Sequence, residues 1–146
     1  MVVRAAWGYT VETATLAIRM VLSGVFEKYP RLNFILGHLG EGIPAYLWRI
    51  DNRNNWMKMP HTYAAKKSVA DYVRDNFVLT TSGNFSTSAL DQAIAEIGVD
   101  RVLWSADYPF EDISDAAEWI DAAPLSEADR TRICRTNALK LFKLAK

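Results

Sequence analysis

The sequence predicts an α/β fold built on a small parallel sheet. Three short apolar runs, rich in β-branched and aromatic residues, are typical of buried strands and lie at Asn33–Gly37, Phe77–Thr81 and Arg101–Ser105. Longer segments with apolar residues at helical spacing separate these runs. Strict alternation of this kind indicates parallel strands joined by helical crossovers. A closed barrel needs about eight strands, so we expect this sheet to be part of something larger or to be completed by a partner.

The helical segments are predicted from periodicity and from capping residues. They are expected at Val11–Tyr29, Glu41 to about Met59, Val69–Arg74, Ser86–Ile97, Ile113–Ala122 and from Ser126 to the basic C-terminal end. Ser86 and Ser126 are predicted N-caps, and Gly98 is a predicted C-terminal stop. The second helix has a predicted inner stripe of Ile43, Tyr46, Leu47 and Ile50. Its charged residues Arg49, Asp51 and Arg53 lie largely off that stripe, where a solvated face is favoured over a binding role.

Composition sets the broad class of the protein. The chain has 146 residues, enough for one domain spanning 1–146, and its 17 basic and 17 acidic residues balance. This balance gives no reason to expect nucleic acid or an anionic membrane as a partner, and no apolar run approaches the roughly 20 residues of a membrane span. Cys134 is the only cysteine, so we interpret it as a small packed residue in a reducing, cytoplasmic setting.

Two strand ends carry ionisable side chains. His38 follows the first strand, with Glu41 three residues later, and Asp107 follows the third strand. The carboxyl ends of parallel strands lie at one face of a sheet, so we expect these groups to converge there as an acid/base or metal constellation. A metal site usually takes three or four protein ligands, so this set is incomplete. The residues alone leave open that His38 is structural and that Asp107 is a turn former.

Five motifs extend the interpretation beyond single residues. In chain order they are I-L-G-H-L-G-E-G-I-P, L-W-R-I-D-N-R, T-T-S-G-N-F, W-S-A-D-Y-P-F and T-N-A-L-K-L-F. Together they resemble the amidohydrolase superfamily, in the branch of metal-dependent non-oxidative decarboxylases. The resemblance is closest to the gamma-resorcylate and 2,3-dihydroxybenzoate decarboxylase group and more distant to aminocarboxymuconate semialdehyde decarboxylases. It covers essentially all 146 residues but only the C-terminal portion of the family's chain, which implies part of a TIM (β/α)8 barrel.

The resemblance implies decarboxylation of a hydroxylated aromatic acid such as a dihydroxybenzoate. Asp107 matches a metal ligand that also protonates the ring carbon bearing the carboxylate. His38 matches the histidine at the metal centre, and Glu41 matches the glutamate that orients this histidine. A carboxylate and an imidazole suit zinc, manganese or magnesium in different measure, so the implied cofactor is a divalent metal.

Three further residues receive implied roles at the substrate. Phe110 matches an aromatic wall of the substrate pocket. Arg49 and Asn54 match a stretch near subunit contacts in this branch and are expected to face a neighbour's site, which implies a homo-oligomer.

The chain departs from the family pattern in its metal ligands. The family's N-terminal Glu-x-His or His-x-His strand and the strand with the next histidine ligand have no match here, and His61 fits neither position. We therefore expect weak metal binding and little activity from this polypeptide alone. Two alternatives remain: a lactonase-like metal-dependent hydrolase, and a non-catalytic fragment that pairs with another chain through its sheet edges.

Overall fold

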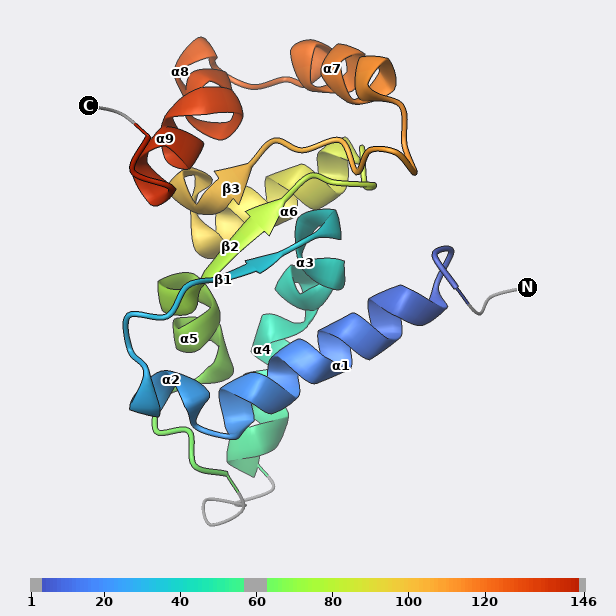
Figure 1. Cartoon of the computed structure of the whole chain (residues 1–146). Coiled ribbons are helices and arrows are strands. Elements are labelled where there is room, and N and C mark those ends of the chain that lie inside the picture. The colour runs from blue at the N-terminus through green and yellow to red at the C-terminus, as the bar shows by residue number, and fades with distance from the viewer. Residues whose placement is uncertain (1–3, 57–62, 145–146) are drawn as a thin grey trace. The chain divides into compact units, whose positions relative to one another are not determined.

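The computed structural model describes residues 4–56 and 63–144. It divides into two compact units, one formed by residues 1–34 and 41–77 and the other by residues 35–40 and 78–146. Each unit is described by itself below, and Figure 1 gives the element labels. Among the described residues, no helix combines the length and apolar character that crossing a membrane requires.

The first unit is helical. It contains α1(Gly8–Leu22), α2(Val25–Lys28), α4(Ile43–Trp56) and α5(Val69–Asn76), with α5 in contact with both α1 and α4. Its core consists of fully buried apolar side chains, which include Ala17, Val21, Phe26, Leu47, Tyr72, Val73 and Phe77. The predicted inner stripe of α4 is correct for Ile43 and Leu47, which are buried, but wrong for Tyr46, which is exposed. The predicted end of this helix near Met59 lies outside the described residues.

The predicted single helix Val11–Tyr29 is two helices separated by a break at Gly24. Gly24 has a φ of 80°, in the left-handed region. A Cβ at this position would lie 2.7 Å from the Cβ of Ala64. The break needs glycine on two grounds, its left-handed backbone and the close approach of Ala64, and helical periodicity does not contain this tertiary contact.

Asp51 fixes the start of α5 from the neighbouring helix α4. Its two carboxylate oxygens accept hydrogen bonds from the backbone N–H groups of Val69, at 2.7 Å, and Ala70, at 3.1 Å. Negative charge at a helix N-terminus satisfies donors that lack partners within the helix. The prediction that Asp51 belongs to a solvated charged face is therefore wrong, since its carboxylate joins two helices.

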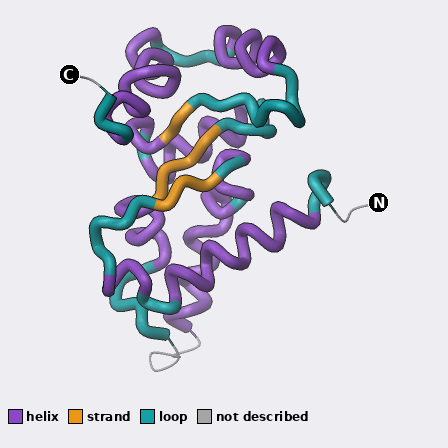
Figure 2. Tube along the Cα trace, viewed as in Figure 1, coloured by secondary structure: helices purple, strands orange, loops and turns teal. Residues whose placement is uncertain are grey.

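The second unit contains most of a three-stranded sheet. The strands β1(Phe34–Leu36), β2(Phe77–Thr80) and β3(Val102–Leu103) lie side by side in the order β1-β2-β3 (Figure 2). β2 and β3 pair in parallel, with Leu79 opposite Val102. The three strands are confirmed, but β3 is shorter than predicted at both ends. Arg101 belongs to the 3-10 helix η1(Val99–Arg101), and the N–H of Trp104 donates to the carbonyl of Ile133. The prediction that β1 is buried throughout is wrong at Ile35, which is exposed.

The remaining helices of the second unit follow the sequence closely. They are α6(Thr87–Ile97), α7(Ile113–Ala122), α8(Glu127–Thr131) and α9(Asn137–Leu141), with five π-helical residues, η2(Arg132–Thr136), between the last two. Ser86 and Ser126 cap α6 and α8 as predicted, each accepting a backbone N–H with its hydroxyl oxygen. Cys134 is exposed, so its interpretation as a packed residue is wrong.

A buried asparagine ties the C-terminal helices to β3. The Nδ2 of Asn137 donates to the carbonyl oxygens of Val99 and Val102, each at 2.9 Å. The backbone N–H of Trp104 donates to the carbonyl of Ile133 at 3.0 Å. These bonds hold β3 and the residues that follow it against η2 and α9.

The substitution Asn137→Ala should lower the free energy of unfolding by about 1–3 kcal/mol, because the carbonyls of Val99 and Val102 lose their shared buried donor. Urea denaturation followed by circular dichroism measures the change. Gln92→Ala, at an exposed position of α6, is the control and should stay within about 0.5 kcal/mol of the parent. Equal unfolding midpoints for Asn137→Ala and the parent would contradict the assigned role.

The hydrogen bond between Tyr72 and Glu27 makes the stability of the first unit depend on pH. The hydroxyl of Tyr72 donates to the carboxylate of Glu27, and this hydrogen bond, with the nearby Lys66 charge, lowers the pKa of Glu27 from its ordinary 4.5. A lowered pKa in the folded state stabilises the protein above the unfolded pKa, and this stabilisation is lost as pH falls through the folded pKa.

Tyr72→Phe should therefore destabilise the protein most at neutral pH, with a smaller difference below pH 4.5. A pH-independent part remains, because the Tyr72 oxygen also accepts from the backbone N–H groups of Lys66 and Lys67. Thermal unfolding between about pH 3 and pH 7, an interval that spans the titration of carboxyl groups, measures the pH-dependent and the pH-independent loss of stability. Tyr9→Phe, at an exposed position, is the matched control; a constant difference across this range would refute the linkage.

Candidate functional site

The chain leaves β1 in a left-handed turn. Five consecutive residues have positive φ: His38 at 52°, Leu39 at 53°, Gly40 at 83°, Glu41 at 54° and Gly42 at 76°. This stretch includes the segment marked α3(His38–Glu41), and α4 begins only at Ile43. The prediction that Glu41 opens the helix is therefore wrong. Left-handed conformation costs about 1–2 kcal/mol for each non-glycine residue, and strain of this kind concentrates at functional sites.

A strained residue, Asp107, also follows the exit of β3. Asp107 has a φ of 84°, and its carbonyl accepts hydrogen bonds from the N–H groups of Phe110, at 2.9 Å, and Glu111, at 3.3 Å. α7 begins at Ile113 and is capped by Asp112, whose carboxylate accepts the N–H of Ser114. The side chain of Asp107 is therefore not a helix cap.

His38 and Asp107 meet at the carboxyl edge of the sheet. The Nε2 of His38 lies 3.7 Å from Oδ2 of Asp107, longer than a hydrogen bond, and the two side chains are 40% and 33% exposed. The expected convergence of these two strand ends is present in the structure. Both side chains are therefore partly open to solvent.

The loop after the middle strand lies against both groups, and sequence reasoning missed it. Gly83 has a φ of 62°, and a Cβ there would lie 2.8 Å from Cδ2 of His38 and 3.0 Å from Oδ2 of Asp107. The Nδ2 of Asn84 donates to the carbonyl of His38 at 3.3 Å. The sequence did contain a signal for this loop. The second strand is followed by Ser82, Gly83 and Asn84, and the rule that placed His38 and Asp107 at one edge of the sheet places these residues there as well.

The donor set fits a divalent metal in type but not in number. An imidazole nitrogen and a carboxylate oxygen are suitable ligands for such an ion. Among residues 4–56 and 63–144, no group of three or more His, Cys, Asp or Glu side chains could hold a metal. Metal sites usually take three or four protein ligands, so His38 and Asp107 by themselves would leave such a site short of ligands. His61 lies outside the described residues.

The other candidate residues are found in both units. Phe110 belongs to the second unit and is 84% exposed, so its ring is free to face a ligand. Glu41, Arg49 and Asn54 belong to the first unit. Glu41 is 6% exposed, which is unusual for a carboxylate, whereas Arg49 lies on the exposed face of α4. The roles of all four residues remain predictions.

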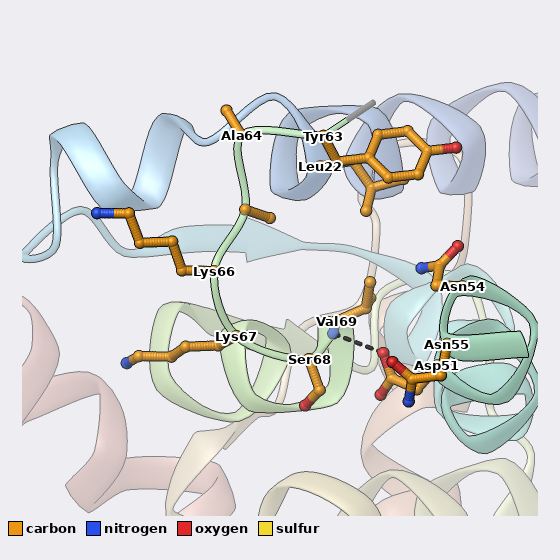
Figure 3. Close-up of a pocket in the computed structure, with 11 residues that line it drawn as sticks. Leu22, Asp51, Asn54, Asn55, Tyr63, Ala64, Lys66, Lys67, Ser68 and Val69 are labelled. Atoms are coloured by element: carbon orange, nitrogen blue, oxygen red, sulfur yellow. Dashed lines mark hydrogen bonds between the residues drawn. The ribbon is translucent and has the colours of Figure 1, made fainter. Parts of the chain in front are cut away.

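Asn54 lines a hollow of about 870 Å³ in the first unit. In Figure 3 the Asp51 carboxylate faces the backbone nitrogen of Val69, while Lys66 and Lys67 extend away from Asn54. The Nζ of Lys67 lies 3.1 Å from Asp75, and that of Lys66 lies 3.8 Å from Glu27. Since the lysine charges face carboxylates of their own unit and do not converge on the hollow, we assign no anion site to it.

Comparison with known proteins identifies the family of this chain. The family model described as Amidohydrolase matches residues 2–144. Gamma-resorcylate decarboxylase from Rhizobium sp. (strain MTP-10005) is 54% identical over 138 residues, which cover 94% of this chain and 42% of the relative.

Solved structures show the same likeness. A dihydroxybenzoic acid decarboxylase from Polaromonas sp. JS666, with bound manganese and the inhibitor 2-nitroresorcinol, has a TM-score of 0.93 and 52% identity, covering 98% of this chain and 43% of that one. A 5-carboxyvanillate decarboxylase from Sphingomonas paucimobilis has a TM-score of 0.90 and 40% identity, covering 96% and 42%. The likeness confirms the predicted fold, an open α/β part of a TIM barrel.

The chain thus spans about 42% of the length of the curated relatives that it matches. Within that span the family model matches nearly every residue. The chain belongs to the amidohydrolase family.

Proposed function

We propose that this chain is the C-terminal part of a metal-dependent, non-oxidative decarboxylase of hydroxylated aromatic acids, with 2,6-dihydroxybenzoate as the model substrate. The observation that carries the proposal is the 3.7 Å approach of His38 and Asp107 at strained strand exits. The relatives support it, since they include gamma-resorcylate decarboxylases and a 2,6-dihydroxybenzoate decarboxylase from Rhizobium.

Asp107 is assigned the proton transfer. Loss of carbon dioxide leaves an electron pair on the ring carbon, so a proton must be delivered to that carbon before or as the bond to the carboxylate breaks. A carboxyl group at the site edge can form the new C–H bond by giving up its proton, and the released electron pair returns to the ring. Asp107 is one-third exposed, so its carboxylate can regain a proton from solvent.

His38 and Asp107 together are the proposed metal ligands in this chain. A bound divalent cation supplies positive charge that stabilises the substrate carboxylate and the adjacent phenol oxygen. Relatives were solved with manganese; within this group of ions, zinc and magnesium remain candidates.

Glu41 and Phe110 have supporting roles in the proposal. Glu41 is a buried carboxylate three residues after His38, and we assign it to fixing the tautomer of the imidazole. Phe110 presents an exposed ring two residues after Tyr108, which is also exposed, and we assign it to one wall of the substrate pocket.

The exposed face of α4 is the proposed contact with a second copy of the chain. Tyr46, Trp48 and Arg49 are all exposed on this helix, Trp48 by 76%. Large aromatic residues and arginine are enriched in the energetically important parts of protein interfaces. In the proposed homo-oligomer, Arg49 of one copy faces the substrate carboxylate in its neighbour's site, with Asn54 on the same helix near the contact.

The function is tested in a chimera in which this chain replaces the matching 138 residues of the Rhizobium gamma-resorcylate decarboxylase. With manganese, the chimera should release carbon dioxide from 2,6-dihydroxybenzoate, and Asp107→Asn should lower kcat by about 10²–10⁴-fold because the proton donor is lost. The chain alone should bind manganese weakly and release little carbon dioxide, because its ligand set is incomplete.

Two outcomes would contradict this assignment. If the chain alone bound metal tightly at one equivalent, by mass spectrometry, and released carbon dioxide from the substrate, the claim that its ligand set is incomplete would be wrong. A folded, metal-loaded chimera that hydrolyses lactones but does not decarboxylate would replace the proposed activity with the hydrolase alternative.

The shared site is tested by mixing two variants of the chimera. Arg49→Ala and Asp107→Asn should each be nearly inactive alone. If Arg49 acts in the neighbour's site, co-expressed copies should regain about a quarter of the parental rate, since half of random dimers are mixed and each mixed dimer has one intact site. Absence of any recovery in oligomers of parental size would place Arg49 in its own subunit's site or outside the site altogether.

A further inference from the structure

The exit loop of β2 lies between the two candidate catalytic groups because of the strand order. β2 is the middle strand, so the loop that follows it runs between the exits of β1 and β3 (Figure 2). His38 comes from the first exit and Asp107 from the third. Any side chain on the middle loop that faced the edge of the sheet would occupy the space where these two groups meet.

Gly83 is the residue of this loop that faces both groups. The position of its missing Cβ lies 2.8 Å from Cδ2 and 3.0 Å from Nε2 of His38, and 3.0 Å from Oδ2 of Asp107. A real Cβ essentially never lies as close as 2.8 Å to another heavy atom, so a side chain here would force its neighbours to move. A side chain at Gly83 would therefore displace the ring, the carboxylate or both.

Asn84 holds the backbone of His38. Its Nδ2 donates at 3.3 Å to the carbonyl of the first left-handed residue of the turn. The backbone N–H of Asn84 itself donates to the carbonyl of Thr81 at 3.0 Å, so the loop is a tight turn with a defined position.

Thr81 anchors the other end of the loop to β3. Its side chain is fully buried, and Oγ1 both donates to the carbonyl of Ser105, at 2.8 Å, and accepts the N–H of Ser105, at 2.9 Å. The N–H of Gly83 donates to the carbonyl of Ala106, the residue before Asp107, at 3.3 Å. Continuous hydrogen bonds thus connect His38, through Asn84 and Thr81, to the backbone next to Asp107.

We propose that Gly83 and Asn84 are positioning residues: Gly83 sets the distance between the His38 ring and the Asp107 carboxylate, and Asn84 fixes the left-handed turn that carries the ring. The catalytic consequence of this arrangement rests on the proposed function. The geometric part stands apart from it and is tested without turnover.

The first test is nuclear magnetic resonance on the full chain, with His61→Gln so that His38 is the single histidine. A strong nuclear Overhauser effect is expected between the Hα protons of Gly83 and Hδ2 of His38, because the Cβ direction of Gly83 points at that ring edge. Asn84→Asp keeps the shape of the side chain but removes its donor, and it should weaken this effect at least about twofold.

Gly98→Ala is the matched control for Gly83→Ala. Gly98 also has positive φ, at 87°, but a Cβ there meets nothing within 4 Å. Both substitutions therefore place an alanine at positive φ, where a side chain is strained, and only Gly83→Ala adds contact with the site. Gly83→Ala should shift the ring resonances of His38, whereas Gly98→Ala should leave them at the parental positions.

The second test is manganese binding to the chimera, measured by electron paramagnetic resonance. Gly83→Ala should weaken the affinity for the metal alone by about tenfold or more, as substitutions that disturb ligand orientation do, and Gly98→Ala should not change it. A missing Overhauser effect in the folded parent, or equal effects of the two alanines on His38, would overturn the proposal. A chimera that binds manganese as expected but lacks decarboxylase activity would refute only the proposed function.

Discussion

The contact of His38 and Asp107 with Gly83 is the constraint on which the second unit depends. Three strand exits meet there, and the middle one contributes a residue without a side chain. The surrounding bonds keep the exits in place: Thr81 connects β2 to the residues after β3, and Asn137 holds β3 against the C-terminal helices. Each of these bonds uses a buried polar group, and such groups are costly to leave unpaired, so they fix a single arrangement.

The same region holds much of the backbone strain of the described chain. His38, Leu39, Glu41 and Asp107 have positive φ without being glycine. At about 1–2 kcal/mol each, these residues together cost about 4–8 kcal/mol, a large fraction of the 5–15 kcal/mol by which a typical domain is stable. Strain of this size persists only where the surrounding packing allows no alternative, and the buried strands β2 and β3 supply that packing.

The arrangement also accounts for the donors that lie at this edge of the sheet. The open sheet brings together three strand exits, and the middle exit contributes a glycine at the point where the other two meet. Two donors, His38 and Asp107, are the result. The chain spans about 42% of its curated relatives, and the proposed activity therefore depends on ligands from a more complete barrel.

The sequence by itself determined most of the elements and the convergence of two strand ends. Apolar periodicity located the strands and most helices, serine side chains located two helix starts, and the parallel-sheet rule predicted that His38 and Asp107 would converge. These signals are local, or they follow from strand direction, so a single chain contains them.

The tertiary structure decided what depends on contacts between distant segments. The break at Gly24 requires the approach of Ala64, the capping role of Asp51 requires α5 beside α4, and the fit at Gly83 requires β2 between β1 and β3. The left-handed turn at His38 belongs to the same class, since His38, Leu39 and Glu41 do not prefer that conformation. Local propensity cannot encode such features, because their free energy comes from partners tens of residues away in the sequence.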